Sequence, residues 1–210
     1  MRAQPAFGRA FPWVLSVLAA ALVVALGQRQ RDLSRAYDRL REWATLPHTG
    51  LQVPAFTTST LDGAPVTIGA AAAPEARQVL FVLRTGCPYC LATLPVWQRI
   101  ADSVRRVATP QVELYGISLD AADSTKAYVR AHHVSYPVLT FPDRKFVLLY
   151  RAVATPETVV LDDGGRVLYA RTGLLDSAAV LDSVFRAATA PLRRANTVLP
   201  GTPVAGRPGR

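Results

Sequence analysis

The sequence predicts an α/β domain built on one mixed β-sheet with helices on both faces. Short apolar or alternating runs, typical of strands, are interspersed with segments of helical periodicity. Over residues 51–188 they give the order β-hairpin, β, α, β, α, β, β, β, α. Strands joined through a helix favour parallel pairing, whereas strands joined by a tight turn pair antiparallel. Both connections occur, so we expect both kinds of pair in the central sheet.

The first part of this domain combines a hairpin, a buried strand and a helix. Residues 54–68, PAFTTSTLDGAPVTI, hold two β-prone runs around an Asp-Gly pair, which is a strong hairpin pattern. Residues 79–83, VLFVL, form an unbroken apolar run, as expected of a strand covered on both faces. Apolar residues at three- and four-residue spacing then predict a helix from 88 to about 107. Pro95 lies inside it and should kink it, because proline removes one backbone donor.

The middle of the domain adds two strands and another helix. Residues 111–119, QVELYGISL, alternate in polarity and predict a second strand. A helix is expected over 121–132, with Asp123 near its start, where a negative charge suits the helix N-terminus. Residues 136–141 predict a third, short strand.

The end of the domain is expected to form a hairpin followed by a closing helix. Residues 158–162 and 166–171 flank an Asp-Gly-Gly turn and should pair with each other. Apolar residues at helical spacing over 174–188 predict the last helix, with Asp176 as its starting residue.

The segment before the domain carries an apolar run that predicts a membrane anchor. After a short basic stretch, 1–10, residues 11–27 contain no charge, and as a helix they would span about 26 Å, the low end of a bilayer crossing. Residues 28–50 have helical periodicity and predict a stalk. A cleaved signal peptide is the alternative, since Ala25-Leu26-Gly27 fits a small-residue cleavage pattern. We expect an uncleaved transmembrane signal-anchor.

Charge placement argues against nucleic acid as a partner. The net charge is +9, but residues 51–188 contain 13 basic and 12 acidic side chains and are nearly neutral. A nucleic-acid-binding domain would need a basic stripe across its own surface. The excess positive charge lies at the two ends of the chain. One of these ends, residues 189–210, is rich in Pro, Gly and Arg, and we expect it to be disordered. Arginines flanking the apolar run, two before it and five after, do not decide its orientation.

Cys87 and Cys90, the only cysteines, lie in the stretch RTGCPYCLATLP, where the buried strand ends and a helix begins. Pro88 suits the first helical position, since its missing donor would have no partner there. The amides of Tyr89 and Cys90 should then point at the Cys87 sulfur and favour its thiolate. Cys87 is therefore the predicted nucleophile, and Cys90 should resolve the mixed disulfide.

Other uses of two cysteines fit the sequence less well. Zinc usually needs four ligands, and here only three histidines, His48, His132 and His133, accompany the pair. The adjacent histidines would point about 100° apart on a helix, which makes a poor chelate. A disulfide across so small a loop would constrain the unfolded chain little. A copper site using both sulfurs and one histidine stays open, but we expect a redox couple with no metal or cofactor.

The chain resembles the thioredoxin fold and, more closely, the TlpA/ResA-like family of membrane-anchored thiol-disulfide oxidoreductases. The resemblance rests on CPYC, Pro95, the stretch LYGISLDA and, above all, TPETVVLDDGGRVLYARTG, and it covers about residues 50–188. It implies that the Thr155-Pro156 bond is cis and faces the cysteines. The Thr155 backbone would then pair with an extended substrate segment. Pro88, Tyr89, Thr155 and Pro156 are thus the expected supporting residues.

The resemblance also implies partners and a location. Protein thiols and disulfides would be the substrates, most often the cysteines of apocytochrome c before haem attachment. A membrane or soluble thiol would donate the electrons. The domain would lie on the periplasmic side of the inner membrane, held there by a single-pass N-terminal helix.

The chain departs from the family at three positions of the expected site. Gly86 stands where many relatives have Trp before the first cysteine, which leaves the rim barer. Phe81 and Thr93 occupy two positions where thioredoxin-like proteins can place a proton-handling carboxylate. The proton acceptor for Cys90 would then be water or an unplaced group such as Glu113, for which an exposed strand position is the plainer interpretation.

Three other functions are compatible with parts of the pattern. The Pro-Tyr pair between the cysteines also occurs in glutaredoxins, which would indicate glutathione as a partner. A peroxiredoxin-like peroxide reductase would have Thr and Pro where this chain has Arg84 and Leu80, and Thr85 is one residue out of register. A non-enzymatic copper-binding or redox-sensing module would use the same two sulfurs.

Overall fold

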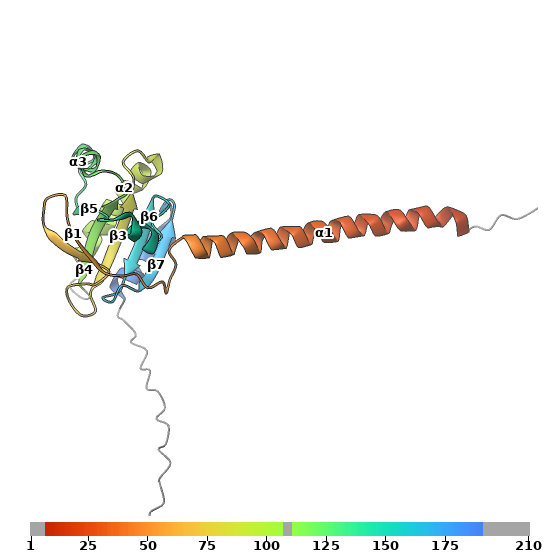
Figure 1. Ribbon diagram of the computed structural model, residues 1–210, viewed down its shortest axis with the longest axis horizontal. Coiled ribbons are helices and arrows are strands. Elements are labelled where there is room, and N and C mark those ends of the chain that lie inside the picture. Colours follow the sequence, from red (N-terminus) through yellow and green to blue (C-terminus); the bar gives the residue numbers. More distant parts are fainter. Residues whose placement is uncertain (1–6, 107–110, 191–210) are drawn as a thin grey trace, which may run out of the picture.

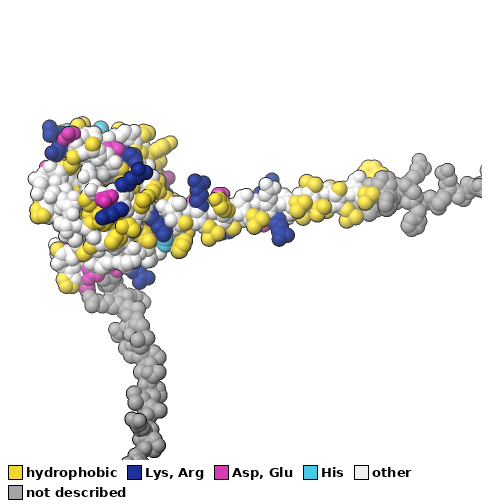
Figure 2. Space-filling view, viewed as in Figure 1, with side chains coloured by type: hydrophobic (Ala, Val, Ile, Leu, Met, Phe, Trp, Pro, Cys, Tyr) yellow, Lys and Arg dark blue, Asp and Glu magenta, His cyan; other side chains and the backbone are white. Residues whose placement is uncertain are grey.

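The computed structural model describes residues 7–106 and 111–190, with backbone alone for residues 7–12 and 14. The first helix, α1 (Phe7–Thr45), is continuous and projects from the compact domain (Figure 1). Its described charged side chains lie in the half nearer the domain, and the described side chains farther out are mainly hydrophobic (Figure 2). Within the described side chains, no helix has both the length and the apolar character of a membrane span. The anchor expected over residues 11–27 is therefore not confirmed. Residues 191–210, most of the tail expected to be disordered, lie outside the described residues.

A five-stranded mixed sheet forms the centre of the domain, as the sequence predicts. Its strand order is β5-β4-β3-β6-β7, with β3–β4 and β4–β5 parallel and β3–β6 and β6–β7 antiparallel. The predicted hairpin near residue 60 forms a separate two-stranded sheet, β1–β2. The strands are β1 (Phe56–Ser59), β2 (Pro65–Ile68), β3 (Arg77–Leu83), β4 (Val112–Ser118), β5 (Val138–Thr140), β6 (Glu157–Leu161) and β7 (Val167–Thr172).

Four helices accompany the sheet: α2 (Pro88–Val104), α3 (Ala122–Ala131), α4 (Arg144–Leu149) and α5 (Ala178–Thr189). Pro95 lies inside α2, as predicted. Asp176 does not start α5; Ser177 is the N-cap and its hydroxyl accepts from the amide of Val180 at 3.4 Å. Helix α4, which has only six residues, was not predicted from the sequence.

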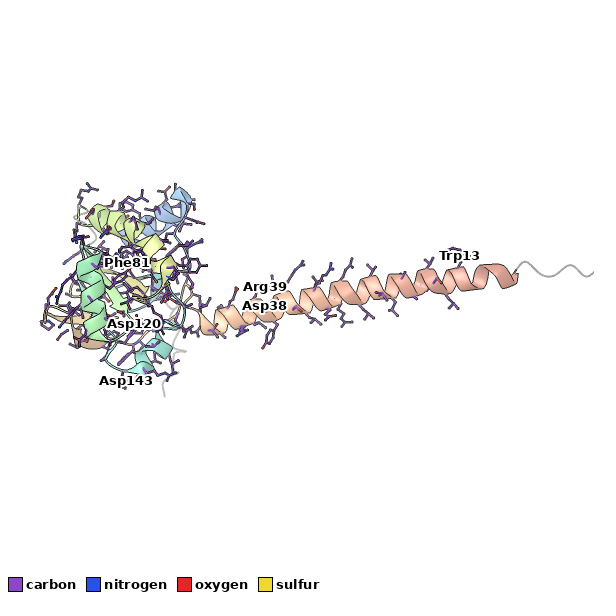
Figure 3. The ribbon with its side chains drawn as sticks, turned by 90° about the horizontal axis from the view of Figure 1, so that it is seen from above. Trp13, Asp38, Arg39, Phe81, Asp120 and Asp143 are labelled. Carbon is purple, nitrogen blue, oxygen red and sulfur yellow. The ribbon has the colours of Figure 1, made fainter. Side chains whose placement is uncertain are left out.

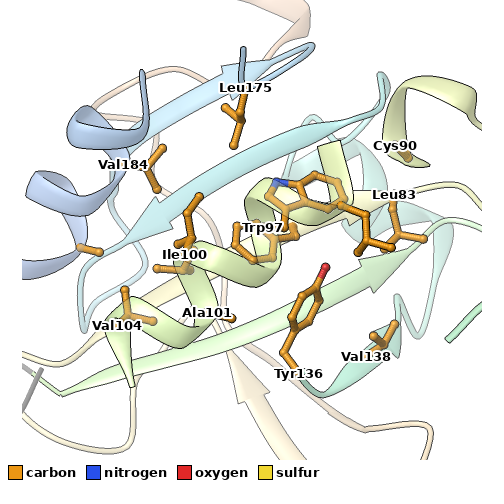
Figure 4. Close-up of a cluster of buried hydrophobic side chains, with 14 of the residues drawn as sticks. Leu83, Cys90, Trp97, Ile100, Ala101, Val104, Tyr136, Val138, Leu175 and Val184 are labelled. Carbon is orange, nitrogen blue, oxygen red and sulfur yellow. The ribbon is translucent and has the colours of Figure 1, made fainter. Parts of the chain in front are cut away.

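Alternation along the strands divides the interior into two clusters of buried side chains. Val79, Phe81 and Leu83 of β3 face α2 and α5, whereas the intervening residues of β3 face the β1–β2 hairpin and α4. On the α2 side, the rings of Phe81 and Trp97 stack with centroids 5.0 Å apart. Figure 3 labels Phe81 within the domain, and Figure 4 shows Trp97 in the centre of the buried cluster. Trp97 also donates its indole N–H to the hydroxyl of Thr158 at 2.9 Å. This packing fixes α2, and with it the cysteine motif, against the sheet.

The end of α1 is attached to the segment that leads into the expected Thr155-Pro156 bond. The Arg151 guanidinium donates to the carbonyl oxygens of Trp43 and Leu46. The same group contacts Nδ1 of His48 at 3.1 Å, and the rings of Trp43 and His48 stack with centroids 4.6 Å apart. The helix therefore joins the domain through a defined set of contacts.

Candidate active site

Cys87 is the N-cap of α2, at the point where the buried strand β3 has ended. Its backbone is extended, with φ −89° and ψ 112°, and Pro88 follows as the first helical residue. The Cys90 amide donates to the Cys87 sulfur at 3.3 Å. Cys87 is partly exposed, so a helix N-terminus presents this sulfur to solvent.

Cys90 lies one helical turn further along and is fully covered by the protein. Its exposed fraction is 0%, and it belongs to the same buried cluster as Leu83 and Trp97. Both cysteines are free thiols in this structure. The pair therefore consists of one accessible sulfur and one enclosed sulfur.

The two thiols differ in acidity for physical reasons. Burial alone would raise the pKa of Cys87, but hydrogen bonds with the Cys90 thiol and amide, with Thr155 and with the Tyr89 amide outweigh it, so the pKa is lowered. For Cys90, burial, the hydrogen bond with Cys87 and the charge of Cys87 raise the pKa to about 12. At neutral pH the proton is thus lost more readily from the sulfur that substrates can reach.

The Thr155-Pro156 peptide bond is cis, as the family resemblance implies, and it lies against the cysteine motif. The Cys87 thiol donates to the Thr155 carbonyl oxygen over 3.7 Å. A hollow of about 600 Å³ opens beside Cys87 and is bordered by Asp120 and Ser124. An extended peptide could reach the sulfur from this side. Tyr89 is 61% exposed on the rim, and apart from the adjacent residues of the chain, no described residue comes within 4 Å of the position that a Cβ on Gly86 would take.

Asp120, which the sequence analysis did not single out, holds the loop that leads into the motif. One of its carboxylate oxygens accepts from the Thr85 amide at 2.6 Å and from the Thr85 hydroxyl at 2.8 Å. The other accepts from Arg84 at 3.2 Å. Burial works against the ionised form, but these partners prevail and lower the pKa of Asp120. The aspartate in LYGISLDA, directly after a strand neighbouring the cysteine strand, was the available clue.

The structure excludes Glu113 as a proton acceptor for Cys90. Glu113 lies opposite Gln78 in the parallel β3–β4 register, whereas the cysteines follow Leu83 at the other end of β3. Its carboxylate accepts from the Gln78 side chain at 2.8 Å and from the Ala72 amide at 2.9 Å. Glu113 therefore has a structural role, remote from the sulfurs.

Phe81 and Thr93 occupy the two positions where thioredoxin-like proteins can place a proton-handling carboxylate, and both side chains are buried. Phe81 is fully buried against Trp97, as described above, and also meets Tyr136 edge-on at 5.3 Å. The hydroxyl of Thr93 donates to the Tyr89 carbonyl at 2.9 Å within α2. Neither residue can accept a proton from Cys90.

Three buried ionisable side chains near the site escaped the sequence analysis. The hydroxyls of Tyr128 and Tyr136 and both carboxyl oxygens of Glu157 lack a hydrogen-bond partner in the described part of the chain. Burial raises the pKa of Glu157 to about 9. These groups are buried by tertiary packing, which the sequence does not show. The sequence offered one indication that Glu157 lies near the site, its position directly after Pro156.

A resident metal site finds no support in the ligand arrangement. Among the described residues, no group of three or more His, Cys, Asp or Glu side chains is placed to hold an ion. His48 lies against Trp43, and the ring of His132 packs on Tyr128 at 4.5 Å. Two of the three histidines that a copper site could use thus pack on aromatic rings.

The fold and the cysteine pair define a protein of thioredoxin-like fold. A family model, the AhpC/TSA family, matches residues 49–170, and the chain belongs to this family. The methylamine utilization proteins MauD of Methylobacillus flagellatus and Methylophilus methylotrophus are 28% and 27% identical over 142 residues. These matches cover 66% of this chain and 63% and 62% of the relatives, so the chain spans under two thirds of their length.

Solved structures of similar fold agree with the TlpA/ResA-like resemblance. StoA from Bacillus subtilis superposes with a TM-score of 0.53 at 16% identity, covering 63% of this chain and 98% of StoA. A thiol:disulfide interchange protein from Chlorobium tepidum gives a TM-score of 0.54 at 20% identity, covering 68% and 98%. Family and fold together show a thioredoxin-fold protein of the AhpC/TSA family, in agreement with the TlpA/ResA-like resemblance.

The acidity difference between the cysteines is testable by alkylation. With iodoacetamide, we expect Cys87 to react with a midpoint pH below the free-thiol value of about 8.5, because amides of α2 stabilise its thiolate. Cys90 should react slowly up to strongly alkaline pH. Mass spectrometry of the Cys87→Ser and Cys90→Ser variants assigns each rate. A midpoint for Cys87 at or above that of a free thiol would contradict the activated nucleophile.

Glu157 should make the domain less stable as the pH rises. The folded pKa of about 9 exceeds the ordinary 4.5, so between these values the folded state retains a proton that the unfolded state has released, and stability falls with pH. At pH 7 this amounts to a cost on the order of 3 kcal/mol. Glu157→Gln should remove the dependence and be more stable than wild type in urea unfolding at pH 8. Glu42→Gln, on exposed α1, is the control and should keep the wild-type slope; an equal slope in Glu157→Gln would refute the assignment.

Proposed function

We propose that this protein is a thiol-disulfide oxidoreductase that exchanges disulfides with protein substrates through Cys87 and Cys90. The observation that carries the proposal is the asymmetry of the pair. Cys87 is accessible and receives the Cys90 amide at 3.3 Å, whereas Cys90 is fully buried one turn away. Only the first sulfur can meet an external disulfide, and only the second is positioned to displace the product.

The exchange runs in two displacements. The Cys87 thiolate attacks one sulfur of the substrate disulfide; the new S–S bond joins protein and substrate, and the other substrate sulfur leaves as a thiolate that takes up a proton. Cys90 then attacks the Cys87 sulfur, the mixed disulfide breaks, and the second substrate thiol departs with the proton that Cys90 gives up. Two electrons pass from the dithiol to the substrate. The same steps in reverse oxidise a substrate dithiol.

The supporting residues position the substrate and the loop. Thr155 places its carbonyl oxygen next to the Cys87 sulfur, so an extended substrate segment can pair with this backbone as an added strand. The hollow beside Cys87, bordered by Asp120 and Ser124, leaves room for other substrate atoms next to the sulfur. Pro88 sets the helix start, and exposed Tyr89 offers an apolar contact on the rim.

We further propose that the domain is tethered to the inner membrane, faces the periplasm and acts on apocytochrome c, with a membrane or soluble thiol as electron donor. The uncharged run over residues 11–27 supports the tether. The TlpA/ResA-like resemblance supports the location, the substrate and the donor.

Insulin reduction and partner capture test the proposal. In dithiothreitol, wild type should accelerate the precipitation of reduced insulin, while Cys87→Ser should have no effect above the reagent alone. Cys90→Ser should hold its target as a mixed disulfide, because the resolving thiol is absent. Capture of that complex from membranes and mass spectrometry identify the target, expected to be an apocytochrome c.

Other outcomes separate the alternative functions. Hydrogen peroxide consumption by wild type above that of Cys87→Ser would favour a peroxide reductase. Arg84 stands where a peroxiredoxin-like enzyme would have Thr, and its side chain is paired with Asp120, which argues against that activity. Stoichiometric Cu(I) binding without insulin reduction would contradict the enzyme and favour a copper-binding module.

A further inference from the structure

A second hollow, next to the one beside Cys87, opens between helix α4 and the ends of β4 and β5. Its volume is about 440 Å³, and it shares Arg84 and Asp120 with the hollow beside Cys87. The two hollows therefore adjoin at the Arg84–Asp120 ion pair. The apolar walls of the second hollow come from Leu119, Phe141, Val147, Leu148, Ala152 and Val153.

Two of these apolar side chains are largely open to solvent. Leu148 is 62% exposed and Val153 is 50% exposed, and no residue of α4 is fully buried. Charged side chains of Arg84, Asp120 and Arg144 also border the hollow. An exposed apolar surface with a polar rim is typical of a site that binds another molecule.

The packing of α4 fixes Leu148 on this surface. The ring of Phe146 packs on Phe56 with centroids 4.6 Å apart, and the Tyr150 hydroxyl donates to the Pro54 carbonyl at 2.9 Å. Leu148 lies between these two anchored residues in the sequence, so the helix cannot turn this leucine inward without losing both contacts. The apolar wall is thus in place before any partner binds, which lowers the entropic cost of binding.

The backbone next to the cysteines leads from the site into this hollow. Val153 stands two residues before Thr155, whose carbonyl oxygen lies 3.7 Å from the Cys87 sulfur. A substrate segment that pairs with this backbone as an added strand advances residue by residue along it, so the residue two positions from the substrate cysteine comes opposite Val153. In this mode of recognition the main chain provides affinity, and pockets for alternate side chains provide specificity.

We propose that this second hollow is a specificity pocket, which binds a large apolar side chain located two residues from the reactive cysteine of the protein substrate. The inference rests on the proposed function and names its substrate class, protein segments with Leu, Ile, Met or Phe at that distance from the cysteine. The volume of the hollow lies in the range of ligand pockets. Leu148 and Val153 pack on the bound side chain and lose their contact with water, which stabilises the complex.

Two synthetic peptides test the pocket. Each is a short glycine- and serine-rich peptide with one cysteine, held as a mixed disulfide with thionitrobenzoate. One carries leucine two residues before and two residues after the cysteine, and the other carries serine at both positions. Attack of the Cys87 thiolate on the peptide sulfur releases thionitrobenzoate, and its absorbance gives the second-order rate constant. With reduced full-length protein we expect the leucine peptide to react at least about tenfold faster, because burying one leucine is worth that factor.

Variants of the apolar wall should remove this preference. Leu148→Ser and Val153→Ser should react with the leucine peptide no faster than with the serine peptide. Leu40→Ser is the matched control: this leucine is 67% exposed on α1, outside the hollow, and the variant should keep both rates. Urea unfolding should give the same stability for Leu148→Ser as for wild type, since substitutions of exposed side chains change stability little.

The outcomes separate this inference from the proposed function. Equal rates of the two peptides with wild type, or a leucine preference that persists in both wall variants, would overturn the pocket and leave disulfide exchange intact. If wild type releases no more thionitrobenzoate than Cys87→Ser from either peptide, the proposed function fails, and the pocket with it. Sedimentation tests another occupant: self-association of wild type that Leu148→Ser abolishes would assign the surface to a second copy of the chain and overturn the inference.

Discussion

The proposed chemistry depends on one hydrogen bond, the 3.3 Å contact from the Cys90 amide to the Cys87 sulfur. It exists because β3 ends at Leu83 and α2 begins at Pro88, so that Cys87 takes the N-cap position, where amides lack helical partners. Helix geometry then places the second cysteine one turn later, on the buried side. The two chemically identical residues thereby acquire different pKa values and different access to solvent.

The surroundings of this contact follow from the strand directions. Because β3 and β4 run parallel, the loop after β3 and the loop after β4 leave the sheet at the same edge, and Asp120 meets Thr85 there. Because β6 runs antiparallel to β3, it enters the sheet at that edge, and Thr155 lies directly before it. Two segments remote in the sequence, the loop after β4 and the segment before β6, thus meet the loop that carries Cys87. Each contributes a backbone or carboxylate group that no local pattern could have assigned to a common site.

Local sequence patterns predicted most helices and strands, but they did not predict the polar side chains that tertiary packing brings to the site. The apolar run at 79–83 forms a strand, as predicted, because a strand buried on both faces is apolar throughout. Both hairpins with an Asp-Gly turn also form, because tight turns require particular residues. Helix α4 has only six residues, which is too few to show a helical repeat of apolar side chains. Its N-cap, Asp143, lies in a stretch where apolar and polar residues do not alternate. Asp176 was predicted to start α5, but the next residue, Ser177, is also a good cap, and only the backbone conformation shows that Ser177 takes this position. The cysteine roles could be predicted because one motif encodes them, whereas the burial of Tyr128 depends on how α3 packs.

The two faces of the sheet separate groups that are close in sequence. Glu157 directly follows the Thr155-Pro156 bond, yet along β6 it shares its face with Val159, which packs in the cluster on the α4 side. Thr158 points to the other face and accepts from Trp97, beside the cysteine motif. A carboxyl group adjacent to the site in sequence is therefore directed away from the resolving sulfur, and its raised pKa affects folding stability. The face toward Cys90 receives tyrosines instead, which stay neutral when buried. A sheet that directs this carboxyl group to its other face keeps the resolving cysteine in an apolar environment, and burial there raises the pKa of Cys90.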